Sequence, residues 1–111
     1  MGQTNNDIFY DSSKVPRLRK SDQLVIVYEN GDVFDYVVKQ CKDAGHIYLC
    51  DCHGAIKADV AAKLNRLSNV AYLPMTKPRS YRYTGTGKLS GISLTDGTTL
   101  HCTKVLIMKG E

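Results

Sequence analysis

The sequence has no long apolar run and no apolar start. No stretch of its 111 residues approaches the roughly 18 apolar residues of a membrane-spanning helix. Residues 1–11 are polar and lack the apolar region of a secretory signal. Asn6 stands where a myristoylation signal requires serine or threonine. We therefore expect a cytoplasmic chain with no membrane partner.

Motifs for catalysis are also missing. The segment Gly85-x-Gly87 precedes Lys88, but it leads into an expected strand, whereas a phosphate-binding loop leads into a helix. Cys50 and His53 lie close in sequence, yet nothing identifies the third group that would orient such a nucleophilic pair. The sequence therefore predicts a protein that is not an enzyme and holds no cofactor.

The four cysteines contain no Cys-x-x-Cys pair, the spacing that aims two thiolates at one structural zinc ion. Without an export signal, we expect the four cysteines (Cys41, Cys50, Cys52 and Cys102) to be reduced and to behave as small buried apolar residues. Cys50, Cys52 and His53, which are residue types that bind zinc, do lie within four consecutive positions. No metal site is predicted, and zinc at these three residues stays open as an alternative.

Positive charge outweighs negative charge, because 15 lysines and arginines face 11 acidic residues for a net charge of +4. The acidic residues fall mainly between Asp22 and Asp59, whereas basic residues gather near the start and in the second half. This distribution favours an anionic partner. Ordinary solvated surface charge is the alternative interpretation.

Two short turns organise the expected strands. Residues 24–28 and 33–38 are rich in β-branched and aromatic side chains, and Asn30-Gly31 lies between them. This pattern predicts a β-hairpin with a type I′ turn. Residues 88–94 and 98–108, separated by Asp96-Gly97, predict a closing hairpin of the same kind.

Further strands are expected at residues 46–50 and 70–74, with a short returning strand at 55–57. Apolar residues recur at helical spacing from Ile56 to Leu67 and predict one amphipathic helix over residues 59–67. The fold class expected is therefore mainly β, a β-rich α+β protein of antiparallel hairpins with one short helix. Residues 1–20 are expected to form a partly flexible polar segment, and 21–111 a single domain.

Residues 77–83 form the most informative segment, because Lys77, Arg79 and Arg82 alternate there with two tyrosines. Guanidinium groups bind phosphates through paired hydrogen bonds or contact guanine edges. The segment therefore predicts a nucleic-acid contact strip. The alternative is an edge strand that its charges keep soluble.

The second half resembles the LytTR family of bacterial DNA-binding domains. Leu64-x-x-Leu67 is followed by an extended stretch at 70–74, by Pro78-Arg79-Ser80-Tyr81, and by a closing segment at 91–100 with an Asp-Gly turn. The strand at 24–29 is similar to the family's early strand. The family's usual histidine before the arginine is Pro78 in this chain.

The resemblance implies a transcriptional regulator whose loops bind duplex DNA in a sequence-specific manner, and it is compatible with a homodimer on DNA. Arg79 would contact a base, and His46 and Lys104 would lie in two further contact loops. The remaining phosphate contacts implied are Lys77, Arg82 and Lys88.

Two other functions stay open. Seven tyrosines and two phenylalanines offer stacking surfaces for single-stranded RNA or DNA, as in a β-barrel-like protein of viral or phage origin. A small β domain with exposed edges also suits a protein-interaction or inhibitor module that recruits its partner by strand addition.

Overall fold

The computed structural model describes residues 7–109. Its elements are β1 (Ile8–Phe9), the short 3-10 helix η1 (Ser12–Lys14), β2 (Gln23–Asn30), α1 (Val33–Gln40), β3 (His46–Asp51), α2 (Ala58–Asn65), β4 (Val70–Pro74), β5 (Pro78–Tyr83), β6 (Leu89–Leu94), β7 (Thr99–His101) and β8 (Lys104–Lys109).

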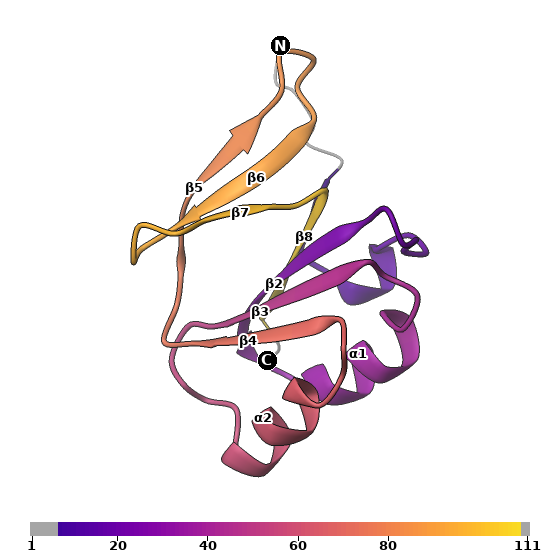
Figure 1. Cartoon of the computed structure of the whole chain (residues 1–111), viewed down its shortest axis with the longest axis vertical. Helices are drawn as coiled ribbons and strands as arrows, with labels where there is room; N and C mark the ends of the chain where they lie inside the picture. Colours follow the sequence, from indigo (N-terminus) through magenta and orange to yellow (C-terminus); the bar gives the residue numbers. More distant parts are fainter. Residues whose placement is uncertain (1–6, 110–111) are drawn as a thin grey trace.

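The strands form two sheets of different kinds. A five-stranded sheet has the order β1-β8-β2-β3-β4, and all its pairings are parallel. A three-stranded antiparallel sheet has the order β5-β6-β7. The helices α1 and α2 lie on one side of the parallel sheet and the antiparallel sheet on the other (Figure 1). The expectation of a mainly β protein of antiparallel hairpins is therefore wrong.

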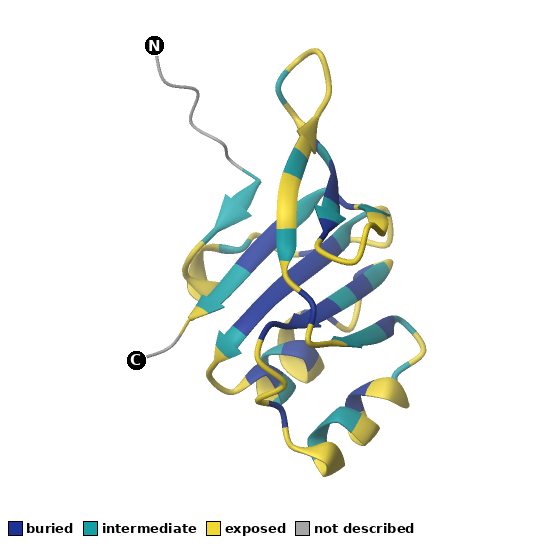
Figure 2. Ribbon diagram, turned by 90° about the vertical axis from the view of Figure 1, so that its left-hand side faces the viewer, coloured by how far each residue is buried: buried dark blue, intermediate teal, exposed yellow. Residues whose placement is uncertain are grey.

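The central strand β2 explains why the main sheet is parallel. Its residues Leu24, Ile26 and Tyr28 pack in the core beneath the helices, whereas Val25 and Val27 pack in a second core beneath the antiparallel sheet. Both faces of β2 are covered, as Figure 2 shows for the buried central strands. Parallel strands buried on both faces have continuous apolar sequences in place of alternating ones.

The predicted hairpin across Asn30-Gly31 is wrong, because the segment after the turn forms helix α1. Asp32 caps this helix, and its side chain accepts a hydrogen bond from the Asp35 N–H at 3.1 Å. Val33 and Val37, four residues apart, are buried on one helical face. The chain then enters β3, which pairs in parallel with β2, so a helical crossover replaces the tight turn.

Several other expected elements are present. Strands β2, β3, β4 and β6 lie where the sequence predicts strands, and α2 overlaps the predicted helix, although residues 55–57 form a loop. The Asp96-Gly97 turn does join antiparallel strands β6 and β7. Gly97 alone carries the positive φ, of 92°, and its N–H donates to Leu94 O at 3.0 Å. The predicted type I′ turn, which requires positive φ at both central residues, is therefore wrong, and the geometry is that of a type I turn followed by a left-handed glycine.

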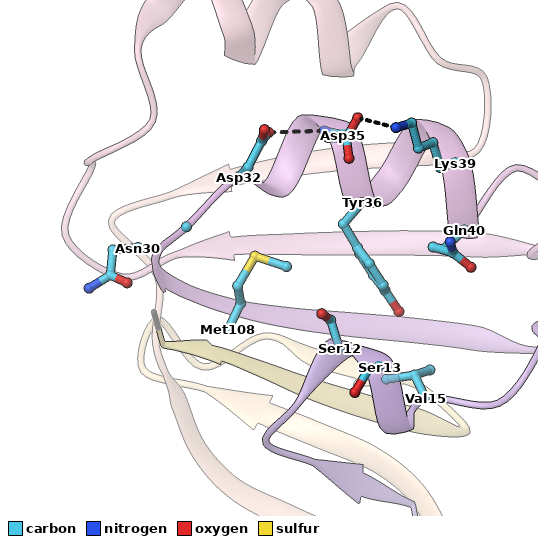
Figure 3. Close-up of a pocket in the computed structure, with 11 residues that line it drawn as sticks. Ser12, Ser13, Val15, Asn30, Asp32, Asp35, Tyr36, Lys39, Gln40 and Met108 are labelled. Carbon is cyan, nitrogen blue, oxygen red and sulfur yellow. Dashed lines mark hydrogen bonds and ion pairs between the residues drawn. The ribbon is translucent and has the colours of Figure 1, made fainter. Parts of the chain in front are cut away.

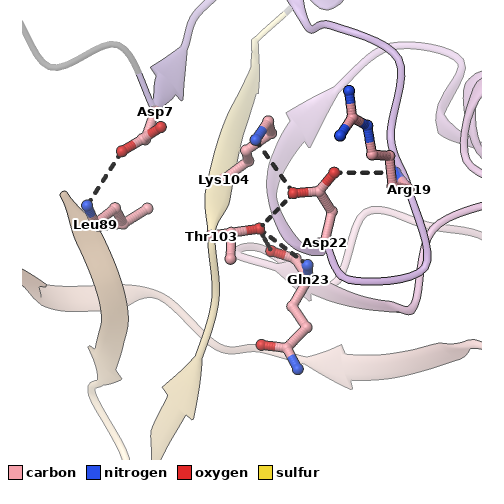
Figure 4. A network of polar contacts seen from close by, with 7 residues as sticks. All are labelled: Asp7, Arg19, Asp22, Gln23, Leu89, Thr103 and Lys104. Atoms are coloured by element: carbon pink, nitrogen blue, oxygen red, sulfur yellow. Dashed lines mark hydrogen bonds and ion pairs between the residues drawn. The ribbon is translucent and has the colours of Figure 1, made fainter.

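The strand expected to run from residue 98 to 108 is broken after His101. Its second part is β8, which pairs with β1 and β2 in the parallel sheet. A polar network anchors its start, because Asp22 accepts hydrogen bonds from Thr103 Oγ1 at 3.0 Å and Lys104 Nζ at 3.2 Å (Figure 4). The network fixes where the chain leaves one sheet and enters the other.

The N-terminal residues contribute to the same sheet. Ile8 and Phe9 pair with β8, and Leu18 is buried in the core beneath the helices. The division into a segment 1–20 and a domain 21–111 stays a prediction. Within residues 7–109, no helix is long and apolar enough to cross a membrane.

Candidate functional site

The turn between β2 and α1 lies at the carboxyl edge of the parallel sheet. Gly31 has a φ of 117°, which L side chains rarely adopt, and Tyr28 donates its hydroxyl hydrogen to Gly31 O at 2.8 Å. Asp32 follows and caps α1. The turn is therefore a defined structure that requires glycine at position 31.

The order of strands marks this turn as a place for a ligand. From β2 the chain adds β3 and β4 on one side, and β8 lies on the other side of β2. In open α/β sheets, ligands bind outside the carboxyl ends of the strands at the point where the strand order reverses. Two cavities adjoin the turn, and both are lined by Gly31 and Asp32.

The first cavity has a volume of about 630 Å³ and lies between α1, η1 and the end of β8. Figure 3 shows Tyr36 extending from α1 toward Ser12 of η1. Most of its lining residues have polar side chains, and the lining comprises Ser12, Ser13, Val15, Asn30, Gly31, Asp32, Asp35, Tyr36, Lys39, Gln40 and Met108.

The second cavity, of about 350 Å³, lies between the starts of α1 and α2. Its walls are largely apolar, with Val33 and Phe34 from α1 and Ile56 and Val60 from the other side. Lys57, which precedes α2, is the one cation among the described residues that line it. A flat aromatic ligand suits such a cavity, because its faces would contact the apolar walls and a polar group on its edge would reach Lys57.

Asp51 ends β3 beside this second cavity, but its carboxylate is not free. The residue is fully buried, and it accepts hydrogen bonds from the N–H groups of Ala55 and Ile56, each at 2.9 Å. Tyr72 donates a third, at 2.7 Å. Burial, followed by this bond to Asp51, raises the pKa of Tyr72 to about 12. Asp51 therefore closes the loop between β3 and α2.

The turn itself is acidic. Asp32 and Asp35 lie at the start of α1, and Lys39 pairs with Asp35 at 3.2 Å. Glu29, at the end of β2, faces His53 at 3.7 Å between carboxylate oxygen and imidazole nitrogen. A helix N-terminus ordinarily favours an anionic ligand, but here the capping carboxylate already occupies it.

The structure places the predicted contact residues in different parts of the molecule, at the amino edge of the parallel sheet, in a cavity between the sheets, and on the antiparallel sheet. His46 begins β3, with its ring 4.4 Å from that of Tyr48, and Lys104 begins β8. Lys77 lines a further cavity of about 390 Å³ between the two sheets. Three others lie on or beside the antiparallel sheet and are exposed: Arg79 and Arg82 on β5, and Lys88 in the loop before β6.

The cysteines are free thiols, and all four are buried. Burial raises the pKa values of Cys41, Cys50 and Cys102 to about 12 each. Burial, with Glu29 as the next cause, also raises the pKa of Cys52. These thiols stay protonated at neutral pH and are poor nucleophiles. Within residues 7–109, no group of three or more metal-binding side chains is placed to hold an ion.

Sequence reasoning missed Gly31, Asp32, Phe34 and Asp51 as site residues. One signal for them was available. A continuous apolar strand precedes Gly31, and Asp51 follows twenty positions later, the spacing at which nucleotide-binding sheets place an acidic residue. The hairpin interpretation of Asn30-Gly31 concealed that signal.

Comparison with solved structures identifies the fold. The chain superposes on thioredoxin reductase from Streptococcus pyogenes (TM-score 0.74, 12% identity, 95% of this chain and 36% of that one). Thioredoxin reductase from T. acidophilum is similar (0.75, 13%, 95% and 36%). So is putidaredoxin reductase in a covalent complex with putidaredoxin (0.76, 19%, 95% and 29%). The chain thus spans about a third of the length of these proteins.

No protein-family model matches the sequence, and no curated protein does. At the identities found, the structural likeness shows the fold alone, which is Rossmann-like. The resemblance to LytTR domains is therefore wrong. The predictions of duplex DNA binding as a transcriptional regulator, of a nucleic-acid partner and of a homodimer on DNA fall with it. The fold points neither to single-stranded nucleic acid nor to the predicted protein-interaction module.

Proposed function

We propose that this chain is a nucleotide-recognition domain that holds a nucleoside or nucleotide at the carboxyl edge of its parallel sheet. The observation that carries the proposal is the pair of cavities, of about 630 and 350 Å³, that meet at Gly31 and Asp32. They lie where Rossmann-like sheets bind their ligands. Their volumes fall within the range of small-molecule sites.

The chemistry of the second cavity suits a base. Phe34 is half-buried and offers an aromatic surface, and Ile56 and Val60 add apolar wall. Aromatic side chains stack on nucleobases, and each stacking contact contributes roughly 1–3 kcal/mol. The first cavity, on the other side of the turn, is lined by residues with mostly polar side chains.

The residues at the turn do not fit the diphosphate of a dinucleotide. That group needs three small residues in the pattern G-x-G-x-x-G/A, so that backbone N–H groups approach the phosphates. Gly31 is the only glycine between positions 24 and 44. With Gly31 in the central position, Glu29 and Phe34 occupy the other two. Asp51, at the spacing of a ribose-binding acid, already accepts three hydrogen bonds.

We propose further that the chain binds its ligand without catalysing a reaction, in the cytoplasm. The buried, protonated thiols support this, because a dithiol redox centre requires an accessible thiolate. Four unpaired cysteines are also the usual state in a reducing compartment. The oxidoreductases to which the fold is similar are about three times longer than this chain. Their catalytic activity is therefore not part of this proposal.

The proposal is tested by titrating the ¹⁵N-labelled chain with adenosine, AMP, ADP and NAD⁺. Saturable chemical-shift changes centred on Gly31, Phe34 and Lys57, with at least one compound, are expected. Ala55→Phe should abolish them, because Ala55 lines the second cavity and the larger ring fills it. Ala62→Phe on exposed α2 surface is the matched control and should leave binding intact. Failure of every compound to bind contradicts the proposal.

A further inference from the structure

Resting on this proposed function, we propose that the site selects an uncharged nucleoside and excludes nucleoside diphosphates and dinucleotides. Asp32 discriminates between them. Its carboxylate accepts hydrogen bonds from the ribose hydroxyls of the nucleoside and repels a diphosphate at the turn. The ligand class is thus a nucleoside whose base lies against Phe34 and whose diol lies against Asp32.

The first argument is the position of Asp32. It is the residue that both cavities share with Gly31, so any ligand that spans the turn passes its carboxylate. One oxygen accepts the Asp35 N–H at 3.1 Å, and the residue as a whole is exposed. The carboxylate thus occupies the helix N-terminus at which a diphosphate would bind.

The second argument is the balance of charge around the turn. In the first cavity, Lys39 Nζ lies 3.2 Å from Asp35 Oδ1. This ion pair leaves no net positive charge among the residues that line that cavity. Lys57 precedes α2 on the opposite wall of the second cavity. A phosphate placed at the turn therefore meets Asp32 before it reaches that lysine. Like charges in contact across a binding site oppose association strongly.

The third argument is the state of Asp51. An acidic residue at its position would ordinarily accept hydrogen bonds from the ribose. Here Tyr72 and the N–H groups of Ala55 and Ile56 already occupy its carboxylate oxygens. Asp32 is the acidic side chain that lines the second cavity among the residues described, and an ionised carboxylate accepts up to four hydrogen bonds.

The test measures dissociation constants by calorimetry for adenosine, 2′,3′-dideoxyadenosine, ADP and NAD⁺. The wild-type chain should bind adenosine about tenfold more tightly than ADP, NAD⁺ or the dideoxy compound. Asp32→Ser retains a helix-capping side chain and removes the charge. In this variant ADP should bind about tenfold more tightly than in wild type, and adenosine should lose its advantage over dideoxyadenosine.

Asp43→Ser is the matched control, because it removes the same charge from an exposed position outside both cavities. It should leave the wild-type order of affinities unchanged. Equal affinity of the wild-type chain for adenosine and ADP overturns this inference while the proposed function stands. Equal affinity for adenosine and dideoxyadenosine overturns the role of Asp32. If no compound binds, the proposed function itself fails, and the inference with it.

Discussion

Strand β2 at the centre of the parallel sheet and strand β5 at the edge of the antiparallel sheet differ in how deeply they are buried. In β2, five consecutive residues from Leu24 to Tyr28 are buried. In β5, every residue from Pro78 to Tyr83 is half-buried or exposed. Helices cover one face of the parallel sheet and β5–β7 cover the other, whereas the outer face of the antiparallel sheet meets solvent (Figure 1).

The difference shows what each sheet does for the protein. The parallel sheet supplies the rigid edge at which the two cavities meet. The antiparallel sheet covers the apolar face formed by Val25, Val27 and Val105, which helices cover in doubly wound sheets. We therefore expect substitutions to be more costly in the parallel sheet and its turns than in the exposed strands β5 and β7 of the antiparallel sheet.

The largest effect is expected for Leu49→Ala in β3. Leu49 is 0% exposed and packs beneath the helices, so truncation leaves a cavity and should lower the free energy of unfolding by about 2–5 kcal/mol. The same truncation at half-buried Leu100 in β7 should cost about 1 kcal/mol. Urea denaturation measures both. An equal loss at the two positions would contradict the expected difference between the buried core of the parallel sheet and the edge strand β7.

The same contrast explains how much of the fold the sequence predicts. Strand positions follow from local composition, and β3, β4 and β6 are predicted correctly. The pairing of those strands depends on what covers each face. An Asn-Gly pair fits a hairpin turn and a strand-to-helix turn equally well, because both use a glycine with positive φ. The consecutive apolar residues of β2 favour the strand-to-helix turn, because they indicate a strand buried on both faces. The hairpin prediction did not take this into account.

The candidate site was less predictable than the fold. Basic residues drew attention to residues 77–88, yet Arg79 and Arg82 lie exposed on β5, outside both cavities at the turn. Asp32, which lines both cavities, and Asp51, which closes the loop beside one of them, lie at the same edge of the sheet only because β2 pairs in parallel with β3. Such long-range pairing cannot be read from local patterns.

A smaller effect should separate the turns of the two regions. Gly31→Ala forces an L side chain into a φ of 117° and places a Cβ 3.4 Å from Met108 Cγ, which should cost about 1–3 kcal/mol. Gly85→Ala, in the loop between β5 and β6, meets nothing within 4 Å and should change stability by less than about 0.5 kcal/mol. Thermal unfolding of both variants checks this; a Gly31 variant as stable as wild type would show that the turn is not constrained.

The smallest effect concerns a charge at the amino edge of the parallel sheet. Burial opposes ionisation of Asp22, but hydrogen bonds from Arg19, Lys104 and Thr103 outweigh it and lower the pKa of Asp22. Lys104→Met should therefore cost about 1 kcal/mol at pH 7, whereas Arg82→Met on exposed β5 should cost almost nothing. Because the folded-state pKa of Asp22 lies below its unfolded value, this stabilisation is present above about pH 4 and is lost as pH falls further. Urea denaturation at pH 7 and pH 3 should show the gap between Lys104→Met and wild type narrowing with acid, and a gap independent of pH would assign the loss to packing of the lysine stem.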